Sequence, residues 1–150
     1  KSQSKVPSVM TGFYAQAIHI AAENGHADAI VELLAYGADI NSMSMGLTPL
    51  HLAATKNRPE ALKILLENNA KVDIISELDG STALFIACGH GFDVVVRLLL
   101  KYGADTSIRN MKTGAFPLLH ATVNNKMQIV RMLLHDGHAD ANEATADGWR

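Results

Sequence analysis

Blocks of apolar residues recur along the chain at a fixed interval. Four glycines mark that interval, each 34 residues after the one before: Gly46, Gly80, Gly114 and Gly148. Similar apolar segments begin at residues 16–22 (QAIHIAA), 48–54 (TPLHLAA), 82–88 (TALFIAC) and 116–122 (FPLLHAT). A repeat that is missed gives the wrong fold, so it is identified before any secondary structure. Four units tile residues 13–142, with approximate bounds of 13–45, 46–79, 80–113 and 114–142.

Each unit contains two short apolar runs that end at glycine or asparagine. The start Thr48-Pro49 suits a helix, because the hydroxyl caps free N–H groups and proline fits the first turn. The first runs end at Gly25, Asn57, Gly91 and Asn125, and the second runs end at Gly37, Asn69, Gly103 and Gly137. Glycine and asparagine enter the left-handed region most readily, so we expect a helix to end at each. The pattern predicts two antiparallel helices per unit, followed by an extended loop.

Such helices are too short to be stable alone in water. Their apolar residues fall on more than one side of each pair, so a single unit cannot bury them. Stacked units bury them in one continuous elongated core. Paired small residues such as Ala53-Ala54 allow the first helices to approach closely. The sequence therefore predicts an all-α fold.

Residues 48–54 resemble the signature of the ankyrin repeat, and residues 36–41 and 102–105 resemble its closing turn. The resemblance recurs four times in register and implies an ankyrin-repeat α-solenoid of helix-turn-helix units joined by extended or hairpin-like loops. Phe85 and Leu119 stand where the family prefers histidine, so the family's hydrogen-bond network is not expected there. The period exceeds the family's by one residue, and a further residue is inserted near His138. We expect both additions to lie in loops.

The first unit departs from the others. Gln16 and Ala17 replace the Thr-Pro start, and Glu32 occupies the place that an apolar residue holds in the later units. A terminal repeat needs a polar outer face, so Glu32 fits an N-terminal cap. A local shift of one residue explains it equally simply.

The two ends do not match the repeat. Residues 1–12, with Lys, Ser, Gln and Pro, are expected to form a linker or arm. Residues 143–150 fall in register as the start of a truncated fifth repeat. We therefore expect the native protein to continue into further repeats or domains.

Composition and charge narrow the function classes. Hydrophobic residues make up 48% of the 150 residues and charged residues 19%, so the chain can form a packed core. The formal net charge of −2 predicts no nucleic-acid binding. No apolar run reaches the roughly 20 residues that cross a bilayer, so no membrane insertion is predicted. Cys88 is the single cysteine, which points to a reducing compartment and an intracellular location, cytoplasmic or nuclear.

The candidate chemical groups favour structure over catalysis. His19 and His51 could be bases or metal ligands, but the resemblance implies hydrogen bonding between helices. The other five histidines lack metal-site spacing. Cys88 holds a small-residue position and is interpreted as a buried filler. Gly89-His90-Gly91 lacks the features of a phosphate loop and is interpreted as a helix end. No enzyme activity, metal or cofactor is predicted.

The resemblance implies a protein partner bound on a concave surface of loop tips and first-helix ends. The candidate contacts are Glu23, Asn24, Ser44, Met45, Leu47, Thr55, Lys56, Leu78, Asp79, Ser81, His90, Lys112, Thr113, Asn124 and Trp149, with Gly89, Ala115 and Val123 beside them. The loop methionines at 43, 45 and 111 are further contact candidates, because methionine is adaptable at binding surfaces, and ordinary loop residues are the alternative interpretation. Trp149 is a hot-spot candidate.

The leading hypothesis is therefore a protein-interaction module. Two alternatives stay open. The chain could be the substrate-recruiting or regulatory segment of a larger enzyme or channel, or it could be a structural spacer without a ligand. The sequence beyond residue 150 would separate the module from the regulatory segment.

Overall fold

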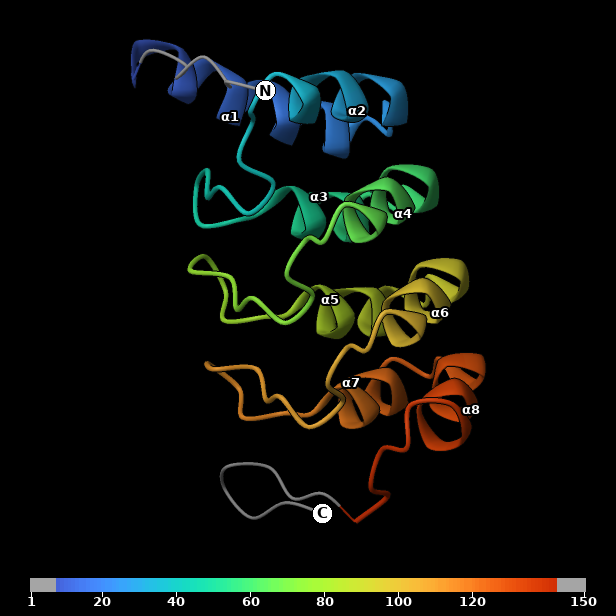
Figure 1. Ribbon diagram of the computed structural model, residues 1–150. Coiled ribbons are helices and arrows are strands. Elements are labelled where there is room, and N and C mark those ends of the chain that lie inside the picture. The colour runs from blue at the N-terminus through green and yellow to red at the C-terminus, as the bar shows by residue number, and fades with distance from the viewer. Residues whose placement is uncertain (1–7, 143–150) are drawn as a thin grey trace.

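The computed structural model describes residues 8–142. Eight helices form within that range: α1 (Ser8–Glu23), α2 (Ala27–Ala35), α3 (Pro49–Thr55), α4 (Pro59–Glu67), α5 (Ala83–His90), α6 (Asp93–Lys101), α7 (Pro117–Val123) and α8 (Met127–His135). The odd-numbered helices stack in one column and the even-numbered helices in a second (Figure 1). The loops project from the side of the odd-numbered helices that is opposite the even column (Figure 1). The chain is an elongated all-α solenoid.

The first helices of units two to four begin where the sequence indicated, whereas α1 begins at Ser8, ahead of the predicted start at Gln16. In α3 the Thr48 hydroxyl accepts a hydrogen bond from His51 N at 3.3 Å, and Thr48 N donates to His51 Nδ1 at 3.1 Å. Together these bonds form a capping box, with Pro49 in the first turn. In α5 the Thr82 hydroxyl accepts from Phe85 N at 3.1 Å. The Thr-Pro and Thr-Ala starts thus satisfy N–H groups that the helix leaves free.

The predicted helix ends are confirmed, and in one of them the left-handed residue lies one position further along the chain than predicted. The first helices of the units are followed by left-handed residues at Gly25, Asn57, Gly91 and Asn125, and the second helices by Gly37, Asn69 and Gly103. α8 likewise ends before Gly137, as predicted, but the left-handed residue that follows it is His138, with φ 53°. Asp136 there is still in the right-handed helical region. The inserted residue moves this turn one place along the chain and lies in a loop, as expected.

The predicted N-terminal arm is wrong for residues 8–12, which are helical in α1. These residues contain no proline and continue directly into the part of α1 that packs on α3. Extending a helix costs far less than starting one, so the packed segment carries its N-terminal neighbours with it. The rest of the expected arm and the expected fifth repeat lie outside the described residues.

The core runs the length of the stack between the two columns. Its largest fully buried aliphatic side chains are Ile18, Ile30, Leu62, Leu65, Leu84, Val95, Val96, Leu99, Ile129 and Leu133. Burial of each such side chain stabilises the fold by about 1.5–3 kcal/mol. Small residues such as Ala53 and Ala87 lie between the odd-numbered helices and are fully buried, as predicted.

The loops are hairpin-like, and their tips differ in length. The first tip closes between Ser44 and Leu47, whose backbones exchange hydrogen bonds of 2.9 and 3.0 Å. The later tips are two residues longer, closing from Ser76 to Ser81 and from Asn110 to Ala115. This difference accounts for the shorter interval between the first two units, and it places the extra residues in loops, as expected.

Neighbouring tips are joined by backbone hydrogen bonds. Glu77 N donates to Gly46 O, and Met111 N donates to Gly80 O, each at 2.9 Å. Gly46 and Gly80 both have positive φ, at 79° and 74°. A Cβ on either glycine would also overlap the following tip, at Leu78 N and Met111 Cβ respectively. Glycine at the 34-residue interval therefore allows the tips to stack closely.

Glu32 lies at the sixth position of α2, as Ile64 does in α4, and both helices have nine residues. The one-residue shift is therefore excluded. Glu32 is exposed, whereas Ile64 is half-buried. A cap role for Glu32 is compatible with this placement and stays a prediction.

Candidate protein-binding surface

A groove of about 450 Å³ lies between the loop tips and the helices α3, α5 and α7. It is lined from the tips by Leu47, Leu78, Asp79, Ser81, Asn110, Lys112 and Thr113, and from the helices by Thr55, Phe85, Ile86, His90 and His120. This volume is within the range of ordinary ligand clefts, which are mostly apolar with a few polar groups.

An aromatic pair forms part of the groove wall. The rings of Phe85 and His120 stack with their centroids 4.0 Å apart and their planes 9° apart. His120 also lies against Gly89, where an added Cβ would overlap its Nε2 atom. Burial lowers the pKa of His120, and the neighbouring His90 lowers it further. Both effects favour the neutral form of the imidazole.

Asn110 holds the third loop tip in shape. Its side-chain amide donates to Asp79 O at 3.2 Å and to the Ser81 hydroxyl at 2.8 Å. Its side-chain oxygen accepts from the backbone N–H groups of Lys112 and Thr113, each at 2.9 Å. A buried amide that makes four hydrogen bonds has its full polar capacity satisfied. Asn110 therefore fixes the third tip and also ties it to the second.

Each described tip presents one strongly exposed apolar side chain. Met45 is 90% exposed, Leu78 is 56% exposed and Met111 is 69% exposed. Lys112 lies next to them, and its Nζ donates to Leu78 O at 2.8 Å. The tips therefore form an apolar row beside the groove.

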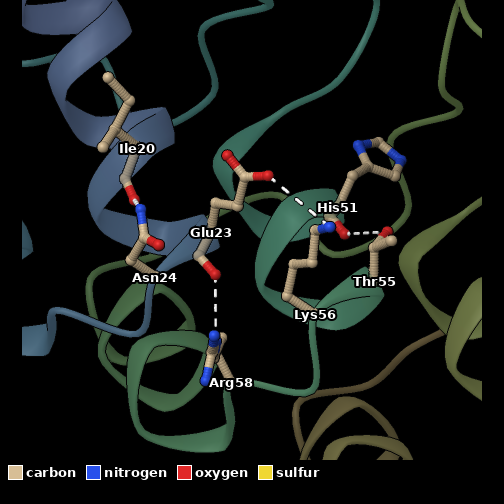
Figure 2. Close-up of polar contacts among 7 residues, drawn as sticks. All are labelled: Ile20, Glu23, Asn24, His51, Thr55, Lys56 and Arg58. Carbon is tan, nitrogen blue, oxygen red and sulfur yellow. Dashed lines mark hydrogen bonds and ion pairs between the residues drawn. The ribbon is translucent and has the colours of Figure 1, made fainter.

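Polar contacts join the C-terminal ends of α1 and α3 (Figure 2). Glu23 and Lys56 make an ion pair at 3.8 Å across α1 and α3, and Arg58 Nε donates to Glu23 O at 3.0 Å. The Thr55 hydroxyl donates to His51 O at 2.8 Å (Figure 2). The side chains of both partners are partly exposed, Lys56 by 49% and Glu23 by 42%, so the pair contributes little to stability. Its groups remain accessible to a partner.

His51 supports this surface from beneath. Its Nε2 donates to Ile74 O at 2.9 Å and to Ser81 O at 3.1 Å. Its Nδ1 accepts from Thr48 N, which assigns the proton to Nε2. Burial lowers the pKa of His51, although its hydrogen bonds to backbone carbonyls oppose that shift. His19 hydrogen bonds through Nε2 to Leu47 O at 2.9 Å, and its Nδ1 lies against Ala15 O.

The two histidines are structural, but they join a helix to the following loop. The expected helix-to-helix bonding is wrong in that detail, because the acceptors are the loop carbonyls of Leu47, Ile74 and Ser81. Phe85 stands at the equivalent place in unit three and stacks on His120 instead. A phenyl ring cannot donate a hydrogen bond, so unit three lacks this link to its loop, as predicted.

Comparison with known proteins agrees with the repeat geometry. The family model described as ankyrin repeats (3 copies) matches residues 3–76 and 71–145, nearly the whole chain. The chain belongs to the ankyrin-repeat family.

Three relatives show the contexts in which such repeats occur. The B-cell lymphoma 3 protein homolog of Mus musculus is 34% identical over 80% of this chain and 28% of its own length. The nuclear factor NF-kappa-B p105 subunit of Gallus gallus is 35% identical over 97% of this chain and 15% of its own length. Human transient receptor potential cation channel subfamily A member 1 is 35% identical over 80% and 11% respectively. The chain thus spans well under a third of these relatives.

Ankyrin repeats are protein-interaction modules, and this chain is one. Within the described residues, no group of three or more His, Cys, Asp or Glu side chains is arranged to hold a metal ion. Cys88 is fully buried, and burial raises the pKa of its thiol far above the ordinary value. Gly91 is left-handed and follows α5, so Gly89-His90-Gly91 is a helix end. None of the described helices is long and apolar enough to cross a bilayer.

Most of the contact residues predicted from the sequence are exposed or half-buried in the structure. The exposed ones are Asn24, Met45, Lys56, Leu78, His90, Lys112, Thr113 and Asn124, and the half-buried ones are Glu23, Ser44, Leu47, Thr55 and Asp79. Ser81 lines the groove but is buried, and its hydroxyl accepts from Asn110. Trp149 lies outside the described residues. Whether the exposed set binds a partner stays a prediction.

Sequence reasoning missed four residues that line the groove: Phe85, Ile86, Asn110 and His120. Asn110 could have been found from the sequence, because it lies 34 residues after Ser76, and serine and asparagine both accept hydrogen bonds from the backbone of turns. In the structure the Ser76 hydroxyl accepts from two backbone N–H groups of the second tip. The Phe85–His120 stack carries no sequence signal, since it joins non-equivalent positions of neighbouring repeats.

Proposed function

We propose that the chain binds a partner protein through the groove and the apolar row of loop tips. The row carries the proposal: Met45, Leu78 and Met111 each expose more than half of their surface, one on each described tip. Exposed apolar side chains gathered on one surface mark interaction sites. Methionine adapts its shape to a partner at low cost.

The geometry favours a partner that spans several repeats. The three tips are tied together by hydrogen bonds at Gly46 and Gly80, and Asn110 links the second tip to the third. A surface that is rigid before binding loses less conformational entropy when the partner docks. The polar residues Lys56, His90 and Asn124 provide groups that fix the partner's orientation.

A photo-cross-linking amino acid placed at Leu78 tests this proposal in cells that express the chain. We expect the probe to capture a partner protein that the same probe at Val94, an exposed residue of α6, does not capture. Replacing Met45 and Met111 by Ser should weaken capture at Leu78 at least tenfold without changing the helical circular dichroism. Equal capture at both positions, or capture that is indifferent to the two serines, would contradict the proposal.

A second candidate is that the chain regulates or recruits substrates for a larger enzyme or channel. It is supported by the relatives, in which such a stretch occupies a small share of a long chain, a cation channel among them. We also propose that the chain itself is non-catalytic, because its buried thiol and its hydrogen-bonded histidines serve the fold. A cytoplasmic or nuclear location is proposed from the single reduced cysteine and from the nuclear factor among the relatives.

A further inference from the structure

The even-numbered helices present a second surface, on the side of the molecule away from the loop tips (Figure 1). Their second, fifth and ninth residues are exposed in all four repeats and define what we call the outer face. These residues are Asp28, Val31 and Ala35 in α2, Glu60, Lys63 and Glu67 in α4, Val94, Arg97 and Lys101 in α6, and Gln128, Arg131 and His135 in α8.

Charge on the outer face changes sign halfway along the stack. The half formed by α2 and α4 carries three acidic side chains and one basic side chain, and the half formed by α6 and α8 carries three basic and no acidic side chains. With histidine neutral, the halves carry −2 and +3. The flanking acidic residues Glu32, Asp93 and Asp136 are also exposed. Including them changes the net charges of the two halves to −3 and +1, which are still opposite in sign.

The basic half has no ion-pair partner among the described residues. Lys63 pairs with Glu67 at 3.8 Å within the acidic half, and the other described ion pair, Lys56 with Glu23, lies near the groove. A hollow of about 310 Å³ opens in the basic half, lined by Arg97, Leu100, Lys101 and Asp136. Exposed Val31 and Val94 add apolar area to both halves of the face.

We propose that the outer face binds the outer face of a second copy of this chain, antiparallel, about a twofold axis between α4 and α6. In a twofold interface, residue i of one copy meets residue j of the other and the reverse contact follows by symmetry. The first repeat then faces the fourth and the second faces the third, so the acidic half meets the basic half twice. A parallel arrangement would place like charges together.

The area of the outer face limits how much surface this dimer can bury. A nine-residue helix is about 13 Å long at ~1.5 Å per residue, and four helices about 10 Å apart span ~40 Å. The face therefore offers roughly 500 Å² per copy, at the low end for specific complexes. Such a dimer forms weakly, and because it depends on exposed charges it weakens as salt screens them. This association goes beyond the proposed function and uses a different surface.

Sedimentation equilibrium of the chain, with matched charge-reversal variants, tests the proposal. One variant, E60K/E67K, reverses the acidic half, and the other, R97E/K101E, reverses the basic half. At about 20 mM salt we expect the parent to approach the dimer mass at several hundred micromolar and to be monomeric at ~0.5 M salt. Each variant alone should be monomeric, and an equimolar mixture of the two should recover dimers.

Three results would overturn the proposal: a parent that stays monomeric at low salt, a variant that dimerises as the parent does, or a mixture of variants that does not associate. Circular dichroism of each variant verifies that the helices are intact. Replacing Met45, Leu78 and Met111 by Ser should leave the dimer unchanged, which separates this proposal from the groove. If R97E/K101E lost an unrelated protein partner while the mixture stayed monomeric, the outer face would bind that partner and not a second copy.

Discussion

His51 is the residue on which the helix α3 and its loop both depend. Its Nδ1 accepts from Thr48, and its Nε2 donates to the carbonyls of Ile74 and Ser81, so only the neutral tautomer fits. Removing one partner of a buried hydrogen bond costs about 1–3 kcal/mol, because the other partner is left unsatisfied. The fold therefore stabilises neutral His51 at the expense of its protonated form.

Stability should fall as the pH drops below the ordinary histidine pKa of about 6.5. Burial lowers the pKa of His51 in the folded state, so the unfolded chain binds more protons below that pH and is favoured. The contribution is fully present above pH ~6.5 and is lost as the pH falls toward the lower, folded-state pKa. Urea unfolding between pH 7.5 and 5.5 measures this loss.

The variant H51F provides the control, since Phe85 occupies the equivalent place in unit three. It should be less stable than the parent at pH 7.5 by about 1–3 kcal/mol. Its stability should decline less than the parent's on acidification. An unchanged decline would assign the pH dependence to other groups, with His120 the first candidate because burial lowers its pKa too.

Gly89 leaves room for the His120 ring at the cost of helix propensity. Glycine within a helix is about 1 kcal/mol less favourable than alanine, yet a Cβ here would overlap His120 Nε2. We expect G89A to stabilise the H120A variant by up to ~1 kcal/mol and to bring little or no gain to the parent. Chemical denaturation of the four proteins measures the coupling; equal gains in both backgrounds would show that the ring moves aside freely.

At the scale of the helix, buried and exposed leucines should differ sharply. Leu99 of α6 is fully buried, so L99A should cost about 2–5 kcal/mol. Leu134 of α8 is partly exposed, so L134A should cost clearly less, about 1 kcal/mol or below. Denaturant midpoints measure both variants. A loss under ~0.5 kcal/mol for L99A would contradict the packing of α6.

The sequence was sufficient to predict most helix ends and eight of the twelve residues that line the groove, but not its aromatic pair. Glycine and asparagine report a left-handed backbone directly, so the ends at Gly25 and Asn57 were predicted correctly. His138 was missed because histidine is an uncommon left-handed residue, and only the inserted residue displaces the turn to it. The burial of Ser81 was not predicted, because it depends on Asn110, a neighbour 29 residues further along the chain.

For the whole molecule, stability follows contacts between neighbouring repeats. Each odd-numbered helix packs on the next odd-numbered helix, and each even-numbered helix on the next even-numbered one, so a disturbance passes from repeat to adjacent repeat. α5 lies between α3 and α7, and its residues 83–88 are all buried. We expect its backbone amides to exchange with solvent more slowly than those of residues 12–17 in α1, which are half-buried or exposed.

The same contacts between neighbouring repeats predict which helices lose amide protection when α6 is destabilised. A cavity at Leu99 loosens α6, which packs on α4, α5 and α8, so amides in those helices should lose protection in the L99A variant. α2 contacts α6 only through α4, so its amides should lose less. Hydrogen exchange read by mass spectrometry at peptide level measures this gradient, with L134A as the matched control.

A uniform loss of protection from α1 to α8 would mean that the stack opens in one cooperative step. Loss confined to α6 would mean that the repeats are independent. A loss graded with distance from α6 is the result that a stack held together by neighbour contacts requires.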